Sequence, residues 1–467
     1  MSTTSRPPHS LTVDHVIDER PISALQIRVI VLCSLVAFVD GFDLQTMALA
    51  VPTLIEVWEL PAAAFGYAQS ASLVGMAIGS VFLGPLGDRL GRKPVMIGGL
   101  IFMGGASLGV IFSTEPNHLV FWRTLVGIGY GTIHGNATAL TAEYAPLRRR
   151  AVLMTVMGSH VALGALVAGL VAPWLIALMG WEGLFIVGAV MPVILAAALL
   201  LAPDSLQLLS ARRPDDPRVA AILRRLAPDV DVRQLRAATA RATPVRGSVL
   251  DLLRPPLRER TWRLWLIYGA TTFLLYLLLS WLPVLLGGAG WSQADALRGI
   301  VWFQLGGIIG GVAISWLVDR GRAVGALIGC YGATAAIAVL FSLLPPIGLV
   351  WSTLIVAIGV SLSGAMFALM ALGALFYPPV VRATGFGWTA AVSRLGAVAG
   401  PLAGAGVLAL GLPSSRIIAL LAVPAALCVL ISLSLRTVLR RIETGEDAEE
   451  AARTSGARLE APAPLAD

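Results

Sequence analysis

The first long apolar stretch of the chain reads QIRVIVLCSLVAFVDGFDLQTMALAVPTL, residues 26–54. It can cross the hydrocarbon core of a bilayer, which is about 30 Å thick and requires about 20 apolar residues. Two carboxylates, Asp40 and Asp43, interrupt this stretch near its middle. A charge at that depth costs about 2.5–3.5 kcal/mol on insertion scales, so acids there indicate a proton or substrate site.

The spacing of these two acids adds a second constraint. Asp43 follows Asp40 by three positions, so a helix places both on one face. The charge of each carboxylate then disfavours ionisation of the other. We expect Asp40 to carry a proton, with Asp43 positioning it. The alternative is a structural ion pair with an arginine inside the protein.

The rest of the chain shares this apolar character. Its 467 residues are 57% hydrophobic and 13% charged, whereas about a quarter of the residues are charged in a soluble domain. The sequence therefore predicts an all-α polytopic membrane protein with twelve transmembrane helices. The candidate spans are 26–54, 64–86, 95–113, 118–142, 151–177, 182–202, 262–287, 296–318, 323–343, 347–375, 382–410 and 413–436.

Arginines are concentrated in every second loop between these spans. The positive-inside rule places such loops, and with them both chain termini, in the cytoplasm. The longest of them carries thirteen arginines and seven acids between positions 204 and 263. We expect this basic segment to lie against anionic lipid headgroups rather than nucleic acid. The sequence contains no metal-ligand spacing and no nucleophile–base arrangement, so we expect neither a cofactor nor an enzyme.

The chain also repeats itself at a nearly constant offset. Asp88-Arg89 recurs as Asp319-Arg320, 231 positions later, and Tyr144-Ala145-Pro146 recurs as Tyr377-Pro378-Pro379, 233 positions later. This predicts two six-helix halves of the kind found in transporters with parallel repeats. The expected divisions are a cytoplasmic N-terminal segment (1–25), the first half (26–202), the basic linker (203–261), the second half (262–437) and a disordered cytoplasmic tail (438–467).

Several motifs resemble those of one family. GPLGDRLGRK at 84–93 is similar to the signature between the second and third helices of the major facilitator superfamily, and RTLVGIGYG at 123–131 resembles its fourth-helix motif. Within the superfamily, DGFD at 40–43 resembles the DGxD signature of the aromatic acid:proton symporters. One departure is PDSL at 203–206, where that family usually has Pro-Glu-Ser-Pro. The resemblance implies a transporter in the inner membrane of a bacterium.

Polar and aromatic side chains near mid-membrane are candidates for contact with the substrate. Arg394 can hold a carboxylate at two points, or act as the counter-ion of the helix 1 acids. Arg123 is either a coupling residue or a structural one that reaches outward to the membrane surface. The remaining candidates, each of which could instead serve only in packing or in structural hydrogen bonds, are His134, Gln304, Tyr276 and Trp388.

A second group of candidates lies in the cytoplasmic loops, too far from mid-membrane to touch substrate. Asp88 is an acid in a positive loop, which topology alone does not explain, and we expect it to act in a gate. Arg92 is expected to pair with Glu143 at the inner end of the fourth helix. Arg89 belongs to the same motif, and Asp319 is the counterpart of Asp88 in the second half.

These observations together predict a proton-coupled importer of an organic, aromatic carboxylate such as a benzoate or hydroxybenzoate. Its partners would be the carboxylate, protons and membrane lipids. Two alternatives remain open. One is a symporter for a non-aromatic or pyridine carboxylate, and the other is a transport-inactive membrane receptor for such an acid.

Overall fold

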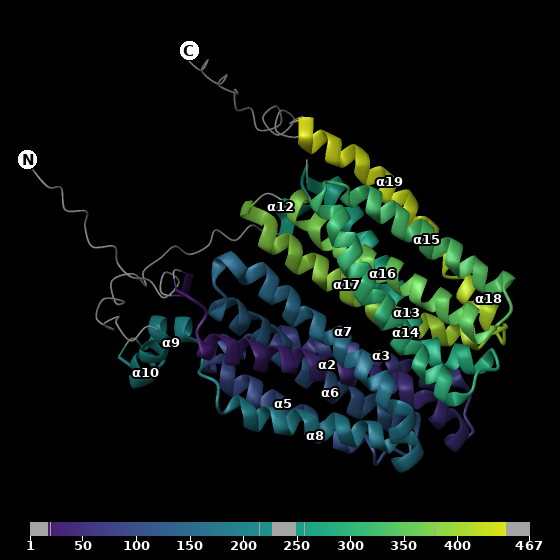
Figure 1. Ribbon diagram of the computed structural model, residues 1–467, viewed down its shortest axis with the longest axis horizontal. Helices are drawn as coiled ribbons and strands as arrows, with labels where there is room; N and C mark the ends of the chain where they lie inside the picture. Colours follow the sequence, from purple (N-terminus) through teal and green to yellow (C-terminus); the bar gives the residue numbers. More distant parts are fainter. Residues whose placement is uncertain are drawn as a thin grey trace, which may run out of the picture. The chain divides into compact units, whose positions relative to one another are not determined.

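A computed structural model describes residues 17–18, 20–213, 215–226, 249–255, 257–377 and 379–444. Every regular element in this part of the chain is a helix (Figure 1). Most of the predicted N-terminal segment, the middle of the basic linker and the tail beyond 444 lie outside the described residues. The all-helical fold class predicted from the sequence is confirmed.

The first six predicted spans correspond to consecutive helices. They are α2 (Ala24–Trp58), the composite of η1, α3 and η2 (Ala62–Phe65, Gly66–Ile78 and Gly79–Leu83), α5 (Arg92–Val110), α6 (Pro116–Tyr144), α7 (Leu147–Met179) and α8 (Glu182–Leu199). Four short helices, α4 (Leu86–Leu90), α9 (Leu206–Arg212), α10 (Pro217–Leu226) and α12 (Val249–Leu252), lie between the spans.

The second six spans also appear in order. They are α13 (Leu257–Gly288), α14 (Gln293–Asp319), α15 (Ala323–Leu343), α16 (Gly348–Phe376), α17 (Pro379–Leu408) and the pair α18 (Ser414–Ala419) and α19 (Ala422–Thr444). The last helix runs further than predicted, because neither glycine nor proline occurs between Pro424 and Gly445. The beginning of the predicted disordered tail is therefore helical.

Eleven helices of the described chain are long and apolar enough to cross a membrane. The fourth predicted span, α6, is the one missing from these eleven, because it carries Arg123, His134 and Asn136 among its apolar residues. Its 29 residues are still long enough to cross a bilayer, about 43 Å at 1.5 Å per residue. Two of these polar residues, Arg123 and His134, belong to the site described below.

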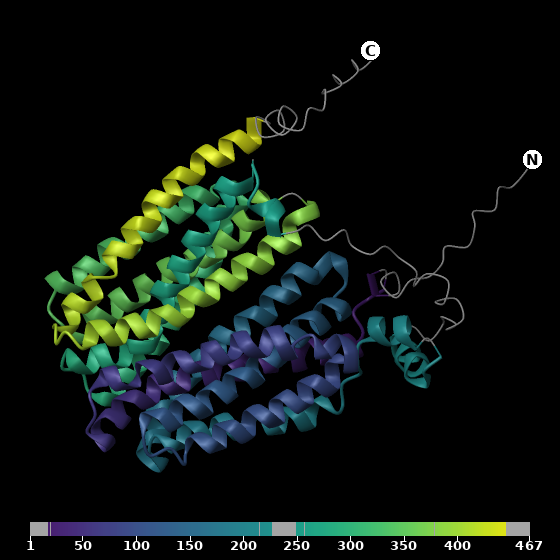
Figure 2. The same cartoon turned by 180° about the vertical axis from the view of Figure 1, so that it is seen from behind.

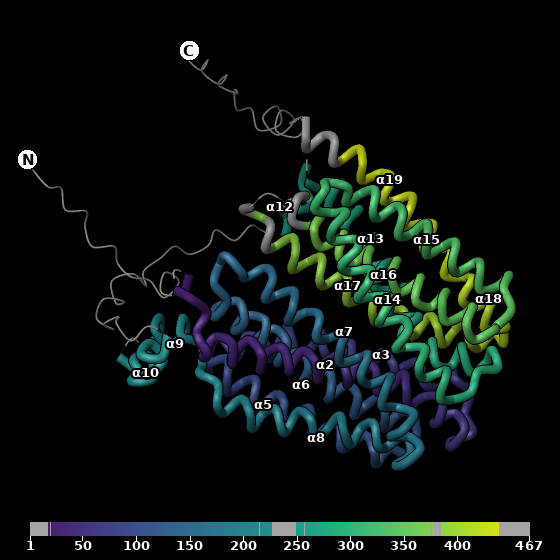
Figure 3. The backbone as a smooth tube through the Cα atoms, viewed as in Figure 1, coloured from purple at the N-terminus to yellow at the C-terminus, as the bar shows by residue number. Residues whose placement is uncertain are grey.

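The described chain forms two compact units. Unit 1 comprises residues 1–243, 278–304 and 401–412, and unit 2 comprises residues 244–277, 305–400 and 413–467. Within unit 1, α2 packs along α7 and also contacts α6, as the two opposite views show (Figures 1 and 2). The same unit holds α9 and α10, which follow α8 as two short helices in the backbone trace (Figure 3).

Close helix packing repeats at the offset that the sequence motifs predicted. In unit 1, Gly164 of α7 lies so close to the carbonyl of Phe38 on α2 that an added Cβ would collide with it. In unit 2, Gly396 of α17 lies in the same way against the carbonyl of Gly269 on α13. A small residue at each crossing lets the backbones approach closely, as is common between membrane helices.

A hydrogen bond at one end of each unit follows the same repeat. Gln26, in the first turn of α2, donates from Nε2 to the last carbonyl of α6, that of Tyr144, at 2.9 Å. Arg260, in the first turn of α13, donates to the last carbonyl of α16, that of Phe376, at 3.1 Å. In both units the start of one span satisfies an otherwise unpaired carbonyl at the end of another.

Candidate functional site

The carboxylate of Asp43 is bound by Arg123, which lies 80 residues later on α6. The Nη1 atom of Arg123 donates to both carboxylate oxygens at 3.0 Å, and Nη2 donates to the backbone carbonyl of Asp43 at 3.2 Å. Thr46 lies one turn further along α2, and its hydroxyl oxygen accepts from Nη1 at 3.4 Å. The pair is a buried, hydrogen-bonded contact between α2 and α6.

Arg123 is only 1% exposed, and its guanidinium lies 5.8 Å from the ring centre of Phe185 on α8. The alternative in which Arg123 reaches outward to the membrane surface is therefore wrong. The guanidinium turns inward because Asp43 offers it a carboxylate and a carbonyl. Removing one partner of a buried pair costs about 3–5 kcal/mol, because the other charge is left without compensation.

Asp40 has a different partner. Its Oδ2 atom lies 3.2 Å from Nδ1 of His134 on α6, and its Oδ1 atom has no hydrogen-bond partner within the described chain. The carboxyl group is 0% exposed, whereas the imidazole is 40% exposed and lies beside the ring of Tyr130. The carboxyl group of Asp40 therefore does not reach the surface itself, but it contacts His134, whose side chain does.

This pair can exist in more than one protonation state. A protonated carboxyl beside a neutral imidazole and a carboxylate beside an imidazolium have the same total charge. Histidine is the side chain whose charge most readily changes between about pH 5 and 8. Asp43 and Arg123, by contrast, form a charge-assisted pair in which one guanidinium nitrogen, Nη1, donates to both carboxylate oxygens. The sequence predicts that Asp40 carries the proton and Asp43 positions it, and the structure gives the two acids chemically different surroundings.

The repeat provides an internal comparison for these residues. The packing contacts described above relate α2 to α13 by an offset of 231 positions and α6 to α16 by an offset of 232. These offsets align Asp40 with Thr271, Asp43 with Leu274 and Arg123 with Ile355. All three residues of the second half are buried and uncharged. At these three positions the second half therefore packs uncharged side chains, so the charges of the first half are not a general requirement of this architecture.

The remaining predicted substrate residues are partners of neither pair within the described chain. Gln304 is in unit 1, where its amide donates to the carbonyl of Ala162 on α7 at 3.3 Å. Unit 2 brings together Arg394 and Tyr276, which interact electrostatically. Trp388 is exposed and stacks on Trp265, with ring centres 6.0 Å apart.

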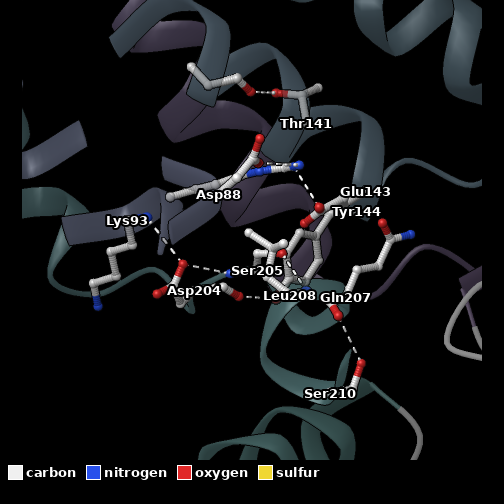
Figure 4. A network of polar contacts seen from close by, with 12 residues as sticks. Asp88, Lys93, Thr141, Glu143, Tyr144, Asp204, Ser205, Gln207, Leu208 and Ser210 are labelled. Carbon is white, nitrogen blue, oxygen red and sulfur yellow. Dashed lines mark hydrogen bonds and ion pairs between the residues drawn. The ribbon is translucent and has the colours of Figure 1, made fainter. Parts of the chain in front are cut away.

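A network of polar contacts joins the α4–α5 turn to the end of α6 (Figure 4). Nη1 of Arg92 lies 2.5 Å from the carboxylate of Glu143, which is the pair expected from the sequence. Asp88 is largely exposed and lies 3.8 Å from Arg92. The backbone carbonyl of Arg89 accepts from Arg212 of α9 at 2.8 Å. In unit 2, Asp319 ends α14 and is exposed.

Asp204 is a member of this network that sequence reasoning missed. Its Oδ1 atom accepts from the backbone N–H groups of Lys93 and Ser205 at 3.1 and 2.8 Å, and its carbonyl accepts from the Tyr144 hydroxyl at 2.8 Å. It stands in the segment PDSL, which in the sequence is notable only as a departure from the family pattern. An acid directly after the last apolar span, followed by a serine that caps α9, was the available signal.

A helical membrane protein of two repeats, with ionisable pairs buried within its spans, belongs to the class of secondary transporters. The profile of the Major Facilitator Superfamily matches residues 33–401. The chain belongs to that superfamily and, within it, to the aromatic acid:proton symporter family that its motifs resemble. Members of this family are transporters, which confirms the expectation that the chain is not an enzyme.

Three relatives illustrate this membership. The gallate transporter of Pseudomonas putida is 35% identical over 424 residues, covering 90% of this chain and 93% of the relative. The 4-hydroxybenzoate transporter PcaK of the same species is 34% identical, covering 90% and 94%. The benzoate transport protein of Acinetobacter baylyi is 28% identical, covering 89% and 91%.

The fold has a counterpart among solved structures. The xylose transporter XylE of E. coli, in a partially occluded inward-open conformation, superposes with a TM-score of 0.66. The superposition covers 88% of this chain and 98% of the transporter, at 16% sequence identity. It supports the architecture of twelve transmembrane helices predicted from the sequence.

Proposed function

We propose that this chain is a proton-coupled importer of an aromatic carboxylate, located in the inner membrane of a bacterium with both termini in the cytoplasm. The names of its relatives support the substrate class. The observation that carries the coupling is the contact between buried Asp40 and accessible His134. The uncharged residues at the equivalent positions of the second half support a functional rather than an architectural role for this pair.

The proton would reach Asp40 through His134. In this proposal the imidazole takes a proton at its accessible face and donates it from Nδ1 to Oδ2 of Asp40, across 3.2 Å. The neutral carboxyl then has no uncompensated charge inside the membrane, where an ionised group is costly. Loss of the proton by the same route restores the carboxylate, and the cycle can repeat.

Asp43 and Arg123 would hold α2 and α6 in the position that this transfer requires. Their pair is buried and held by several hydrogen bonds, and it joins the same two helices that carry Asp40 and His134. We assign it a positioning role. The proton-carrying role remains with Asp40.

Arg394 is our candidate for the group that binds the substrate carboxylate. A guanidinium fits a carboxylate at two points, and Tyr276 beside it supplies a ring and a hydroxyl. Both acids of α2 are engaged by residues of α6, which argues against the alternative that Arg394 serves as their counter-ion. Trp388 is a further aromatic candidate for contact with the substrate. Gln304 is a further polar candidate, and its amide donates a hydrogen bond to α7.

Arg92 and Glu143 are proposed to act in a gate, together with Asp88, Arg89 and the corresponding Asp319. The network in Figure 4 ties the start of α5 to the end of α6 and to the residues that precede α9. Breaking it would change the balance between conformations without touching a ligand at mid-membrane.

Uptake by purified protein in liposomes tests this function. We expect gallate, 4-hydroxybenzoate or benzoate to accumulate when the outside is made more acidic, and not when a protonophore removes the gradient. Cyclohexanecarboxylate is the matched acid without an aromatic ring. Its equal accumulation would favour the non-aromatic alternative, and tight binding of an aromatic acid without uptake would favour the receptor.

Replacing Arg394 by lysine tests the carboxylate contact. Lysine keeps the charge but loses the planar fork, so affinity for the transported acid should fall by about 1–3 kcal/mol, the strength of a hydrogen bond to a charged group. The corresponding amide, if it binds, should be unaffected. Equal losses for the acid and the amide would rule out direct contact between Arg394 and the carboxylate.

A further inference from the structure

A basic pocket lies in unit 1 among the α4–α5 turn, the end of α8, α9 and α10. Its volume is 580 Å³. Two acids, Asp88 and Asp204, line it, so the cations are in excess. The cationic side chains among the described residues that line it are Arg89, Lys93, Arg212, Arg213, Arg218 and Arg225.

Part of this positive charge is already engaged within the protein. The Nζ atom of Lys93 donates to the carbonyls of Leu200 and Ala202 at 2.8 and 2.6 Å. Arg218 forms an ion pair with Asp216 at 2.8 Å. Hydrogen bonds from Arg218 lower the pKa of Asp216 to about 2, so this acid stays ionised and keeps its partner at physiological pH.

Three arginines remain available to a ligand. Within the described chain, the side chains of Arg89, Arg213 and Arg225 take part in no hydrogen bond or ion pair. They come from three different elements, α4, the end of α9 and α10. Arg213 also interacts electrostatically with Asp216. Guanidinium groups that line one pocket and are free of internal hydrogen bonds are suited to an anion with several oxygens, above all a phosphate.

The border of the pocket is apolar. Leu90, Leu200 and Leu201 line it and are exposed. The last two directly follow α8, a predicted membrane span, so they stand where a span leaves the hydrocarbon. A ligand with both a phosphate and an acyl chain would satisfy the arginines and the leucines together, whereas a soluble phosphate would leave the leucines in water.

We infer that this pocket binds the phosphate headgroup of an anionic membrane phospholipid, with its acyl chains against Leu90, Leu200 and Leu201. Basic pockets beside transmembrane helices on the cytoplasmic side are suited to such headgroups. The inference concerns a lipid that is bound rather than transported, and it is independent of the substrate proposed above. A bound lipid would also hold α10 against the ends of α5 and α8.

Lipid binding to arginine variants of the full chain tests this site. Short-chain phosphatidylglycerol would be titrated into protein in a neutral detergent, with retention followed by native mass spectrometry. Arg225→Gln and Arg213→Gln should each weaken binding about fivefold, from the roughly 1 kcal/mol that one arginine contributes near anionic lipid. Arg224→Gln is the matched control, because Arg224 is an exposed neighbour on α10 that does not line the pocket.

The expected pattern is loss with Arg225→Gln and Arg213→Gln, less than twofold change with Arg224→Gln, and weak binding of phosphatidylcholine. If Arg224→Gln weakened lipid binding as much as Arg225→Gln, the lipid would be attracted by the overall positive charge of α10, and the proposed site would be wrong. Binding of glycerol 3-phosphate as tight as that of the lipid would assign the pocket to a soluble phosphate instead. Thermal unfolding of each variant confirms that the fold is retained in the comparison.

Discussion

The Oδ2 atom of Asp40 lies 3.2 Å from Nδ1 of His134, so a carboxyl group with no exposed surface touches an imidazole that is 40% exposed. The two residues lie on different helices and are 94 positions apart in the chain. In our proposal this contact connects the buried acid to the surface through an imidazole. It is the basis of our proposal for coupling.

Replacement of His134 by glutamine should interrupt that route. Glutamine retains a polar side chain but does not bind a proton in the working range of pH. We expect initial uptake at least about tenfold slower than in the unmodified protein, with a flatter dependence on external pH. The measurement is initial uptake in liposomes at a series of external pH values.

His160→Gln serves as the control for this substitution. His160 lies on α7, is partly exposed and contacts the carbonyl of Val156 through Nδ1 at 2.7 Å. Its replacement should leave the pH profile unchanged. A His134→Gln protein with the pH profile of the unmodified chain would exclude His134 from the proton route.

The pair of Asp43 and Arg123 can be tested by exchanging it for the apolar residues of the second half. Arg123→Ile alone leaves Asp43 buried without a partner and should cost about 3–5 kcal/mol of stability. Adding Asp43→Leu should recover most of this loss, because Leu274 and Ile355 occupy the equivalent buried positions in unit 2. Unfolding temperatures in detergent provide the measurement, and additive losses in the double variant would contradict the proposed pairing.

The sequence predicted the helices well because hydropathy and span length depend on local composition. It predicted the pairing of Arg92 with Glu143 from motifs at the ends of neighbouring spans. It did not identify the partners of Asp40 and Asp43, because these depend on which face of α6 turns toward α2. Arg123 lies near the start of the predicted span 118–142, so the sequence allows its side chain to reach outward to the membrane surface. The buried carboxylate of Asp43, 80 residues away, reverses that expectation.

Gly164 tests the close packing of α2 and α7. A methyl group there would collide with the carbonyl of Phe38, so Gly164→Ala should lower stability by about 1–3 kcal/mol. Gly158→Ala, on the same helix, is the control, since an added Cβ meets no heavy atom of the described chain within 4 Å. It should be neutral or slightly stabilising through helix propensity. If both variants unfold at the same temperature, the crossing is less tight than described.

Glu143 tests the proposed gate. Glu143→Gln removes the charge that faces Arg92 and should reduce transport more than tenfold while changing substrate affinity by less than threefold. The reason is that the ion pair of Arg92 and Glu143 is proposed to shift the balance between conformations of the transporter without contacting the substrate. Glu115→Gln, at the opposite end of α6, is the charge-matched control. A parallel loss of affinity and transport would argue for a role in binding instead.

The most direct test of the coupling mechanism compares two kinds of transport in the Asp40→Asn protein. Asparagine keeps the size and polarity of the side chain but carries no exchangeable carboxyl proton. In liposomes with the outside made acidic, the variant should fail to accumulate the aromatic acid that the unmodified protein concentrates. It should still exchange labelled for unlabelled acid at equal concentrations on both sides. Accumulation driven by the pH gradient at the rate of the unmodified protein would contradict the assignment of Asp40 as the proton carrier.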